Sequence, residues 1–191
     1  MTAWRREQTR DPFFRKAKQE HYRARSAYKL LEINRRFELF GRGDTVLDLG
    51  AAPGSWSQVA AEVVGPSGRV IAVDLTPIEA IPGVTTIQAD VLGPLPELPV
   101  ADAVLSDVSP RVSGNRLADH ARSVELADAS LTVAVAHSRP GGNFVVKVFR
   151  GEDFDAFVGR VKRVYRTAKV VVPEATRRES REAYVVGLSR L

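Results

Sequence analysis

The stretch Thr45-Val46-Leu47-Asp48-Leu49-Gly50-Ala51-Ala52-Pro53-Gly54-Ser55-Trp56-Ser57-Gln58 decides the fold of this chain. It begins as a short apolar strand, passes through a turn with two glycines and continues as a helix. Gly50 and Gly54 permit a tight turn and a close approach by a ligand, and Ser55 with Gln58 has the spacing of a helix cap. Open α/β sheets bind ligands where a strand ends and a helix begins. The stretch therefore predicts a small-molecule site.

Length and composition indicate one globular domain spanning residues 1–191. The chain is 44% hydrophobic, which suits a protein with a well-developed core. It has no cysteine and three histidines, so we expect no metal site. No secretory signal is evident, and no apolar run approaches the ~18–20 residues that span a bilayer. We expect a cytoplasmic protein that does not contact a membrane.

The net charge of +5 is unevenly distributed along the chain. Residues 1–43 and 139–191 are rich in Lys and Arg, whereas residues 44–138 are acidic. Two basic ends around an acidic middle predict a face that binds a polyanion. Residues 1–20 contain little apolar surface, and we interpret them as a basic, flexible N-terminal arm.

Apolar runs predict seven strands, at residues 45–49, 69–74, 85–88, 103–106, 143–149, 169–172 and 184–188. Helical patterns occur at 57–64, 124–137 and 154–165, and an earlier one starts at Ser26 and ends at 41–43. This alternation predicts an α/β fold with a mostly parallel sheet and helices on both faces. Residues 140–142 predict a turn before the fifth strand. The polar segment 173–182 predicts an antiparallel last strand.

Four aspartates end four successive predicted strands: Asp48, Asp74, Asp90 and Asp107. The first loop lacks both the G-x-G-x-x-G fingerprint and the lysine of a phosphate-binding loop, so a less anionic ligand is favoured. An acidic residue after the second strand accepts hydrogen bonds from ribose hydroxyls in such folds. Asp90 is placed to meet an adenine amino group. This edge therefore predicts an adenosine-bearing cationic cofactor, S-adenosylmethionine.

Five blocks of sequence resemble one known family. They are Arg25–Leu30, Asp48–Gly54, Ser106-Asp107, Gly142–Phe149 and Ser180–Tyr184. The chain resembles the FtsJ-type ribosomal RNA ribose 2′-O-methyltransferases over nearly all its length after about residue 12. The resemblance implies a Rossmann-like class I S-adenosylmethionine-dependent methyltransferase fold with a seven-stranded sheet.

The resemblance also implies a catalytic tetrad formed by Lys29, Asp107, Lys147 and Glu182. The implied reaction transfers a methyl group from S-adenosylmethionine to the ribose 2′-hydroxyl of a uridine in large-subunit ribosomal RNA, with Lys147 as general base. Burial and the nearby Lys29 favour a neutral amine at Lys147, whereas Asp107 favours the charged form. The residues alone leave that balance open.

Other site residues follow from the matching blocks, the acidic strand ends and the basic segments. The cofactor-binding residues that we expect are Asp48, Gly50, Ala51, Pro53, Gly54, Ser55, Trp56, Asp74, Leu75, Asp90, Val91 and Asp107. The expected RNA contacts are Arg23, Arg25, Arg111, Arg177, Arg178 and Arg181. Two of these positions depart from the family pattern. Ser55 replaces a glycine, and Arg111 adds a positive charge near the expected RNA entrance.

The expected partner is ribosomal RNA, within the large subunit, bound by a monomer. Two alternatives remain at this point: a non-catalytic RNA-binding assembly factor, and a methyltransferase acting on another RNA such as transfer RNA. A nicotinamide-dependent oxidoreductase is disfavoured because the dinucleotide fingerprint is missing.

Overall fold

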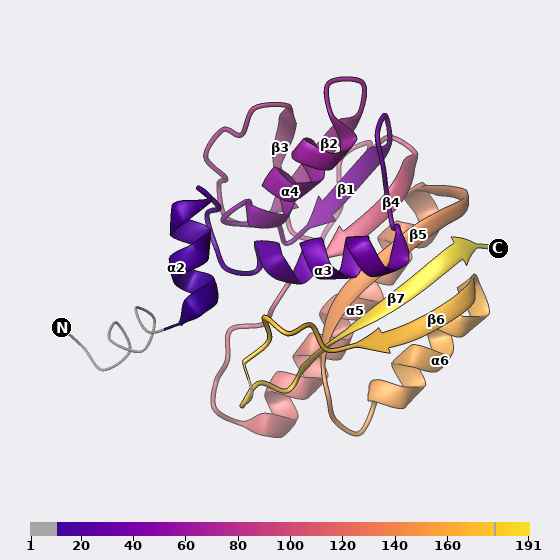
Figure 1. Ribbon diagram of the computed structural model, residues 1–191. Helices are drawn as coiled ribbons and strands as arrows, with labels where there is room; N and C mark the ends of the chain where they lie inside the picture. Colours follow the sequence, from indigo (N-terminus) through magenta and orange to yellow (C-terminus); the bar gives the residue numbers. More distant parts are fainter. Residues whose placement is uncertain (1–10, 178) are drawn as a thin grey trace.

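The computed structural model describes residues 11–177 and 179–191, which contain one seven-stranded sheet (Figure 1). The strands are β1 Thr45–Leu49, β2 Arg69–Asp74, β3 Val84–Gln88, β4 Ala101–Ser106, β5 Ser138–Phe149, β6 Tyr165–Val171 and β7 Glu182–Arg190. Their order across the sheet is β3-β2-β1-β4-β5-β7-β6. The pairs among β1 to β5 are parallel, and β7 is antiparallel to both of its neighbours. The predicted mostly parallel sheet with an antiparallel last strand is confirmed.

Five described helices accompany the sheet. They are α2 Pro12–Gln19, α3 Ala27–Phe37, α4 Ser55–Val64, α5 Arg116–His137 and α6 Phe154–Val164. In Figure 1, α3 and α4 lie in front of the sheet, and α5 and α6 lie behind it. Neighbouring residues of β5 point to opposite faces, so Val145 joins the core under α3 and α4 while Phe144 joins the core under α5 and α6. None of the described helices is both long and apolar enough to cross a membrane.

Part of the segment that we expect to be a flexible arm forms the helix α2. Residues 1–10 lie outside the described part of the chain, but Asp11 accepts hydrogen bonds from the backbone of Phe13 and Phe14 and so caps the helix. The Phe13 ring lies 5.6 Å from the ring of Tyr28, and Asp11 forms an ion pair with Arg25. These few contacts order a segment whose composition is mostly polar.

Other element boundaries differ from the prediction. The helix α3 ends at Phe37 because Glu38 adopts a left-handed conformation (φ 49°), and the Asn34 side chain then bonds the backbone of Phe40. α5 starts earlier than predicted, where Asn115 caps its first turn. The predicted turn at 140–142 lies inside β5 as a bulge, since the register with β4 shifts there.

Candidate active site

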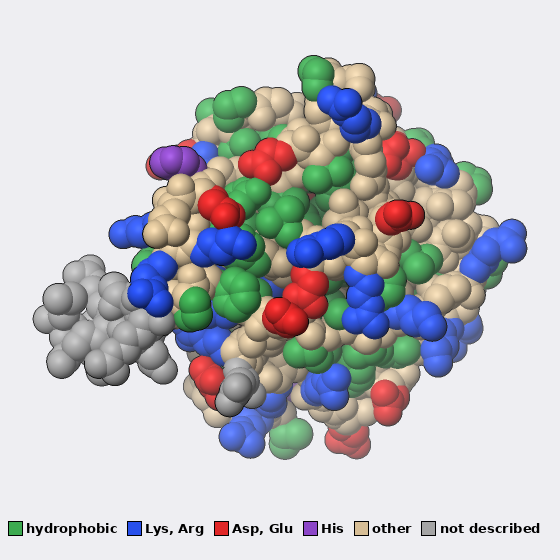
Figure 2. All heavy atoms as spheres, viewed as in Figure 1, with side chains coloured by type: hydrophobic (Ala, Val, Ile, Leu, Met, Phe, Trp, Pro, Cys, Tyr) green, Lys and Arg blue, Asp and Glu red, His purple; other side chains and the backbone are tan. Residues whose placement is uncertain are grey.

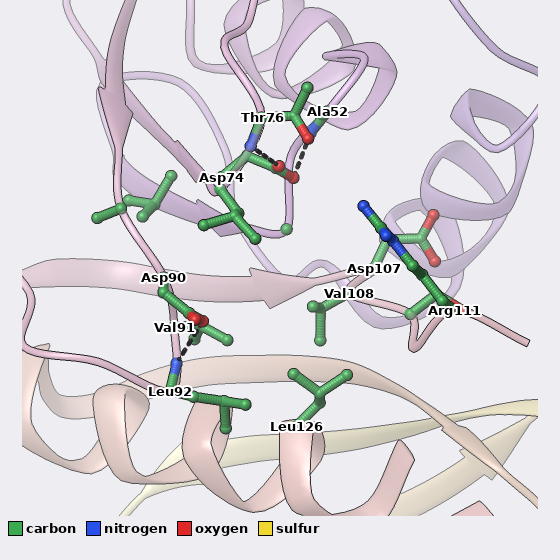
Figure 3. A pocket seen from close by; sticks show the side chains of 15 residues that line it. Ala52, Asp74, Thr76, Asp90, Val91, Leu92, Asp107, Val108, Arg111 and Leu126 are labelled. Atoms are coloured by element: carbon green, nitrogen blue, oxygen red, sulfur yellow. Dashed lines mark hydrogen bonds between the residues drawn. The ribbon is translucent and has the colours of Figure 1, made fainter. Parts of the chain in front are cut away.

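The carboxyl ends of the parallel strands surround a cavity of about 440 Å³ (Figure 3). Three carboxylates reach it, from Asp74 at the end of β2, Asp90 after β3 and Asp107 after β4. The walls between them come from the loop after β1, from the residues that follow β2 and β3, and from Leu126 of α5. The predicted convergence of acidic strand ends is therefore present for three of the four aspartates.

Backbone hydrogen bonds fix two of these carboxylates. Asp74 accepts from the backbone N–H of Ala52 through Oδ2 (2.9 Å) and from that of Thr76 through Oδ1 (2.7 Å), as Figure 3 shows. Asp90 accepts from the backbone N–H of Leu92 (2.9 Å). An ionised carboxylate has about four lone-pair sites. Both side chains therefore keep acceptor capacity for hydroxyl, amino or ammonium groups in the cavity.

The first glycine of the loop brings two cavity walls together. Gly50 has φ +69°, and a Cβ at this position would lie 2.6 Å from the Cα of Val108, which follows β4. Any side chain here would push the two loops apart, so the sequence requires glycine for close backbone approach. The turn that the sequence predicts is present, and the close neighbour of Gly50 is the protein's own backbone, where the sequence analysis expects a ligand.

The predicted cofactor residues fall into two groups. Those that line the cavity are Gly50, Asp74, Leu75, Asp90, Val91 and Asp107. Those outside the cavity lining are Asp48, Ala51, Pro53, Gly54, Ser55 and Trp56. Trp56 is 1% exposed, donates its indole N–H to the Ser26 carbonyl and lies 5.7 Å from the Tyr184 ring. Its side chain belongs to the support of the site.

The helix cap predicted at Ser55 is wrong. Gly54 occupies the cap position with φ +108°, and no side chain caps α4. The Ser55 hydroxyl is buried and lies 2.7 Å from that of Ser26, which joins α4 to the start of α3. Gln58 bonds the backbone of His21 and Arg23 instead. A side chain that packs against a neighbouring helix is unavailable to cap its own.

Asp48 is fully buried on β1, and this gives a prediction for stability. Its Oδ2 accepts from Ser57 (2.6 Å), its Oδ1 has no hydrogen-bond partner within the described residues, and burial raises its pKa from 3.8 to about 7. Between these two pH values the native state holds a proton that the unfolded state has lost, so stability falls as pH rises from about 4 to 7. Asp48→Asn should therefore be more stable than the wild type by about 2–4 kcal/mol at pH 8.

Urea unfolding without cofactor at pH 4 and pH 8 measures this effect. Near pH 4 the two proteins should have similar stability, because the wild-type carboxyl is then neutral in the native state. Asp90→Asn, at an exposed carboxylate, should lack this pH-dependent gain. Equal stability of Asp48→Asn and wild type at both pH values would contradict the raised pKa.

Four charged side chains and a tyrosine meet beside the cavity. Lys147 donates to the backbone carbonyl of Asp107 (2.7 Å), and its Nζ lies 3.1 Å from Asp107 Oδ1. Lys29 donates to Glu182 (2.6 Å). Tyr184 donates its hydroxyl to Asp107 Oδ1 (2.8 Å). The tetrad therefore consists of two lysine–carboxylate pairs, and Tyr184 contacts one of them.

The sheet register explains this assembly. β5 and β7 are antiparallel, and Lys147 lies directly opposite Tyr184. Cross-strand partners share a face, and residues two apart on a strand do so as well, which places Glu182 on the same face. The helix α3 covers that face and contributes Lys29, whose Nζ also lies 5.5 Å from the centroid of the Tyr184 ring.

The sequence analysis missed Tyr184 as a site residue. Its side chain is fully buried, and burial together with Asp107 raises the pKa of its phenol well above the ordinary value of 10. The phenol therefore stays protonated and keeps donating to Asp107. The predicted strand begins at Tyr184 and leaves Glu182 in the preceding polar segment, whereas β7 starts at Glu182 and gives the two residues the spacing that puts them on one face.

The expected RNA-binding arginines have different surroundings. Arg25 pairs with Asp11 and donates to the Ala175 carbonyl, while Arg177 is exposed. Both line a recess of about 210 Å³ with Lys29 and Glu182. Figure 2 shows many Lys and Arg side chains on the face that carries α2 and α3. Arg25 and Arg177, one from each basic end of the sequence, therefore adjoin Lys29 and Glu182 of the tetrad.

The remaining predicted arginines are more varied. Arg111 is exposed and lines the cofactor cavity on the side of Asp107 (Figure 3). Arg181 donates to the Arg116 carbonyl (3.4 Å), and Arg178 lies outside the described residues. Arg23 donates to three backbone carbonyls near the cavity. Its guanidinium is therefore engaged within the protein, which differs from the predicted RNA contact.

The sheet order, the acidic cavity and the adjoining tetrad define a class I S-adenosylmethionine-dependent methyltransferase. The residues that line the cavity fit this cofactor, since their carboxylates can accept hydrogen bonds from its hydroxyl and amino groups and complement its positive charge. Residues 22–190 match the family described as FtsJ-like methyltransferase. The chain belongs to the FtsJ-like methyltransferase family.

Two curated relatives, both called ribosomal RNA large subunit methyltransferase E, match almost end to end. The one from Syntrophobacter fumaroxidans is 49% identical over 187 residues, which cover 94% of this chain and 95% of the relative. The one from Archaeoglobus fulgidus is 47% identical over 185 residues, which cover 93% and 94%. The family that the sequence analysis recognised is thus confirmed.

Solved structures agree on the fold. A crystal structure assigned as a ribosomal RNA methyltransferase from Plasmodium falciparum has a TM-score of 0.78 and 26% identity, covering 89% of this chain and 99% of that one. Aeropyrum pernix fibrillarin with natively bound S-adenosyl-L-methionine has a TM-score of 0.59 and 16% identity, covering 85% and 76%. The predicted Rossmann-like methyltransferase fold is confirmed.

Proposed function

We propose that this protein methylates a ribose 2′-hydroxyl in large-subunit ribosomal RNA and that Lys147 is the general base. The observation that carries the catalytic part is the arrangement of Lys147 and Asp107 at the edge of the cofactor cavity. The names of the curated relatives support the RNA substrate. The target ribose belongs beside Lys147, on the side of the tetrad.

S-adenosylmethionine supplies an electrophilic methyl group on a positively charged sulfur. The ribose oxygen forms a bond to that carbon as the carbon–sulfur bond breaks, and the hydroxyl proton passes to Lys147 Nζ. A neutral lysine amine has two N–H groups and one lone pair. Asp107 offers Lys147 two acceptors, its backbone carbonyl and Oδ1. With both N–H groups directed there, the lone pair remains for the incoming proton.

The second pair holds the acceptor side of the site. Lys29 and Glu182 line the recess of about 210 Å³ together with Arg25 and Arg177. We assign the ribose to the tetrad end of this recess, where the carboxylate of Glu182 can accept a hydrogen bond from a ribose hydroxyl. The exposed guanidinium of Arg177 neutralises backbone phosphate, which contributes affinity without selecting a sequence. Positioning of the reacting atoms in line supplies much of the rate.

Methyl transfer to ribosomal particles tests the proposed function. Purified protein with radiolabelled S-adenosylmethionine should label large ribosomal subunits that lack the modification, and mapping should place the label on one ribose 2′-oxygen, expected on a uridine. Label in transfer RNA with none in large subunits would contradict the ribosomal substrate. Tight RNA binding with no transfer to any RNA would support the assembly factor and contradict the enzyme.

A further inference from the structure

Arg23 joins two loops that border the cofactor cavity. Its Nη1 donates to the carbonyls of Pro53 and Glu79, and its Nη2 donates to the carbonyl of Ala80, each at 2.9 Å. Pro53 belongs to the loop after β1, and the other two acceptors belong to the loop after β2. A single planar guanidinium thus bonds both segments, which a flexible ammonium on a lysine stem would not reproduce.

The neighbouring residues of these two loops line the cavity itself. Ala52 directly precedes Pro53, and Leu75 and Thr76 lie shortly before Glu79. Gly54 also packs beneath the second loop, since a Cβ there would lie 2.5 Å from Ile81 and 3.1 Å from the Arg23 guanidinium. The arginine therefore lies between the two loops, next to residues that line the cavity.

The second loop has few other attachments. Positions 75–77, 79 and 80 are exposed, so apolar packing holds this segment mainly through Ile78 and Ile81. Both of the hydrogen bonds accepted by the carbonyls of Glu79 and Ala80 within the described residues come from Arg23. Removing the guanidinium would release the loop next to Asp74.

The segment that carries Arg23 is itself anchored to α4. The Gln58 side chain accepts from the backbone N–H of Arg23 (2.9 Å) and donates to the carbonyl of His21 (3.0 Å). This anchor keeps the arginine backbone in place against the helix that starts at the cofactor loop. The backbone of Arg23 is therefore held in place while its guanidinium reaches the two loops.

We propose that Arg23 is a positioning residue that sets the affinity for S-adenosylmethionine by holding the loops after β1 and β2 together. This assignment rests on the proposed function only in placing the cofactor in the cavity. It replaces the phosphate contact that the basic N-terminal sequence predicts for this residue. The arginine acts through Ala52, Asp74 and Thr76, which form the hydrogen-bonded wall of the cavity.

Arg23→Lys distinguishes a loop-positioning role from a phosphate contact, because it keeps the positive charge and loses the planar guanidinium that bonds both loops. We expect calorimetry without RNA to show a Kd for S-adenosylmethionine raised about tenfold or more, since charge-assisted bonds to three carbonyls are lost. Hydrogen exchange of amides at positions 76–83 should be faster than in the wild type. Binding to ribosomal RNA and its salt dependence should be unchanged.

Two further variants complete the experiment. Arg23→Ala should weaken cofactor binding at least as much, and Arg42→Ala, at an exposed arginine between α3 and β1, should leave it unchanged. A phosphate contact at Arg23 would instead give Arg23→Lys normal cofactor binding, while Arg23→Ala would reduce the slope of RNA affinity against salt by about one. That outcome would overturn the proposal.

The proposal and the proposed function fail in different ways. A wild-type protein that binds S-adenosylmethionine but methylates no ribosomal RNA would contradict the function and leave the assignment of Arg23 standing. A wild-type protein that methylates ribosomal RNA, with unchanged cofactor affinity and loop exchange in Arg23→Lys, would overturn the assignment alone.

Discussion

Lys147→Ala should lower kcat for methyl transfer about 10³-fold, within the range that general bases contribute. The side chain is 7% exposed, and its ammonium is held against Asp107 by two contacts, so its position in the site is fixed. Single-turnover transfer from labelled S-adenosylmethionine measures the rate, and calorimetry measures cofactor binding. The Kd for the cofactor should change little, because the Lys147 side chain does not line the cavity.

Lys147→Arg distinguishes a base from a source of positive charge. Arginine keeps a cation beside Asp107 but cannot accept a proton, since it stays protonated in proteins. We expect this variant to be as slow as Lys147→Ala. Substantial activity in Lys147→Arg would contradict the general-base role. Lys169→Ala, at an exposed lysine of β6, is the matched control and should retain the wild-type rate.

Glu182→Gln should lower both stability and activity. The Lys29 side chain is only 10% exposed, so the ammonium would lose its charged partner in a place where water replaces it poorly. We expect a loss of about 2–4 kcal/mol in the free energy of unfolding. We also expect kcat to fall about 10²-fold, since the carboxylate no longer orients the ribose.

The double variant Lys29→Met with Glu182→Gln separates the two effects. It removes the unpaired ammonium, so urea unfolding should recover most of the stability lost in Glu182→Gln. Methyl transfer should stay low, because neither charged group of the pair is restored. Full activity in the stable double variant would show that the pair serves the fold alone and would contradict its catalytic assignment.

Local patterns predicted the sheet and its acidic edge from the sequence. Asp74 ends a recognisable strand, Asp90 and Asp107 each follow one, and parallel strands bring such ends to one side. The lysine–carboxylate pairing of Lys29 with Glu182 joins residues that are 153 positions apart. No spacing rule encodes that contact. The family resemblance implies that both residues belong to the tetrad, and the structure shows that α3 and β7 bring them into contact.

Arg23 and Ser55 show the limits of reading side chains by type. Arg23 lies in a basic segment, which favours a phosphate contact. Its guanidinium nevertheless donates hydrogen bonds to three carbonyls of two loops that are distant in sequence. Ser55 has the spacing of a cap, but tertiary contact with Ser26 takes its hydroxyl. In both cases the deciding partner comes from another element, and only the folded arrangement brings it close.

The position of β7 has a consequence for protein synthesis. β7 follows every other strand in sequence, yet it occupies an inner place in the sheet between β5 and β6. A nascent chain that stops before residue 182 lacks both Glu182 and Tyr184, and its β5 lacks the antiparallel partner β7. Such a chain already contains every residue that lines the cofactor cavity, the last of which is Leu126, but it cannot complete the tetrad. The tetrad is therefore complete only once β7 has been translated, after all residues of the donor site.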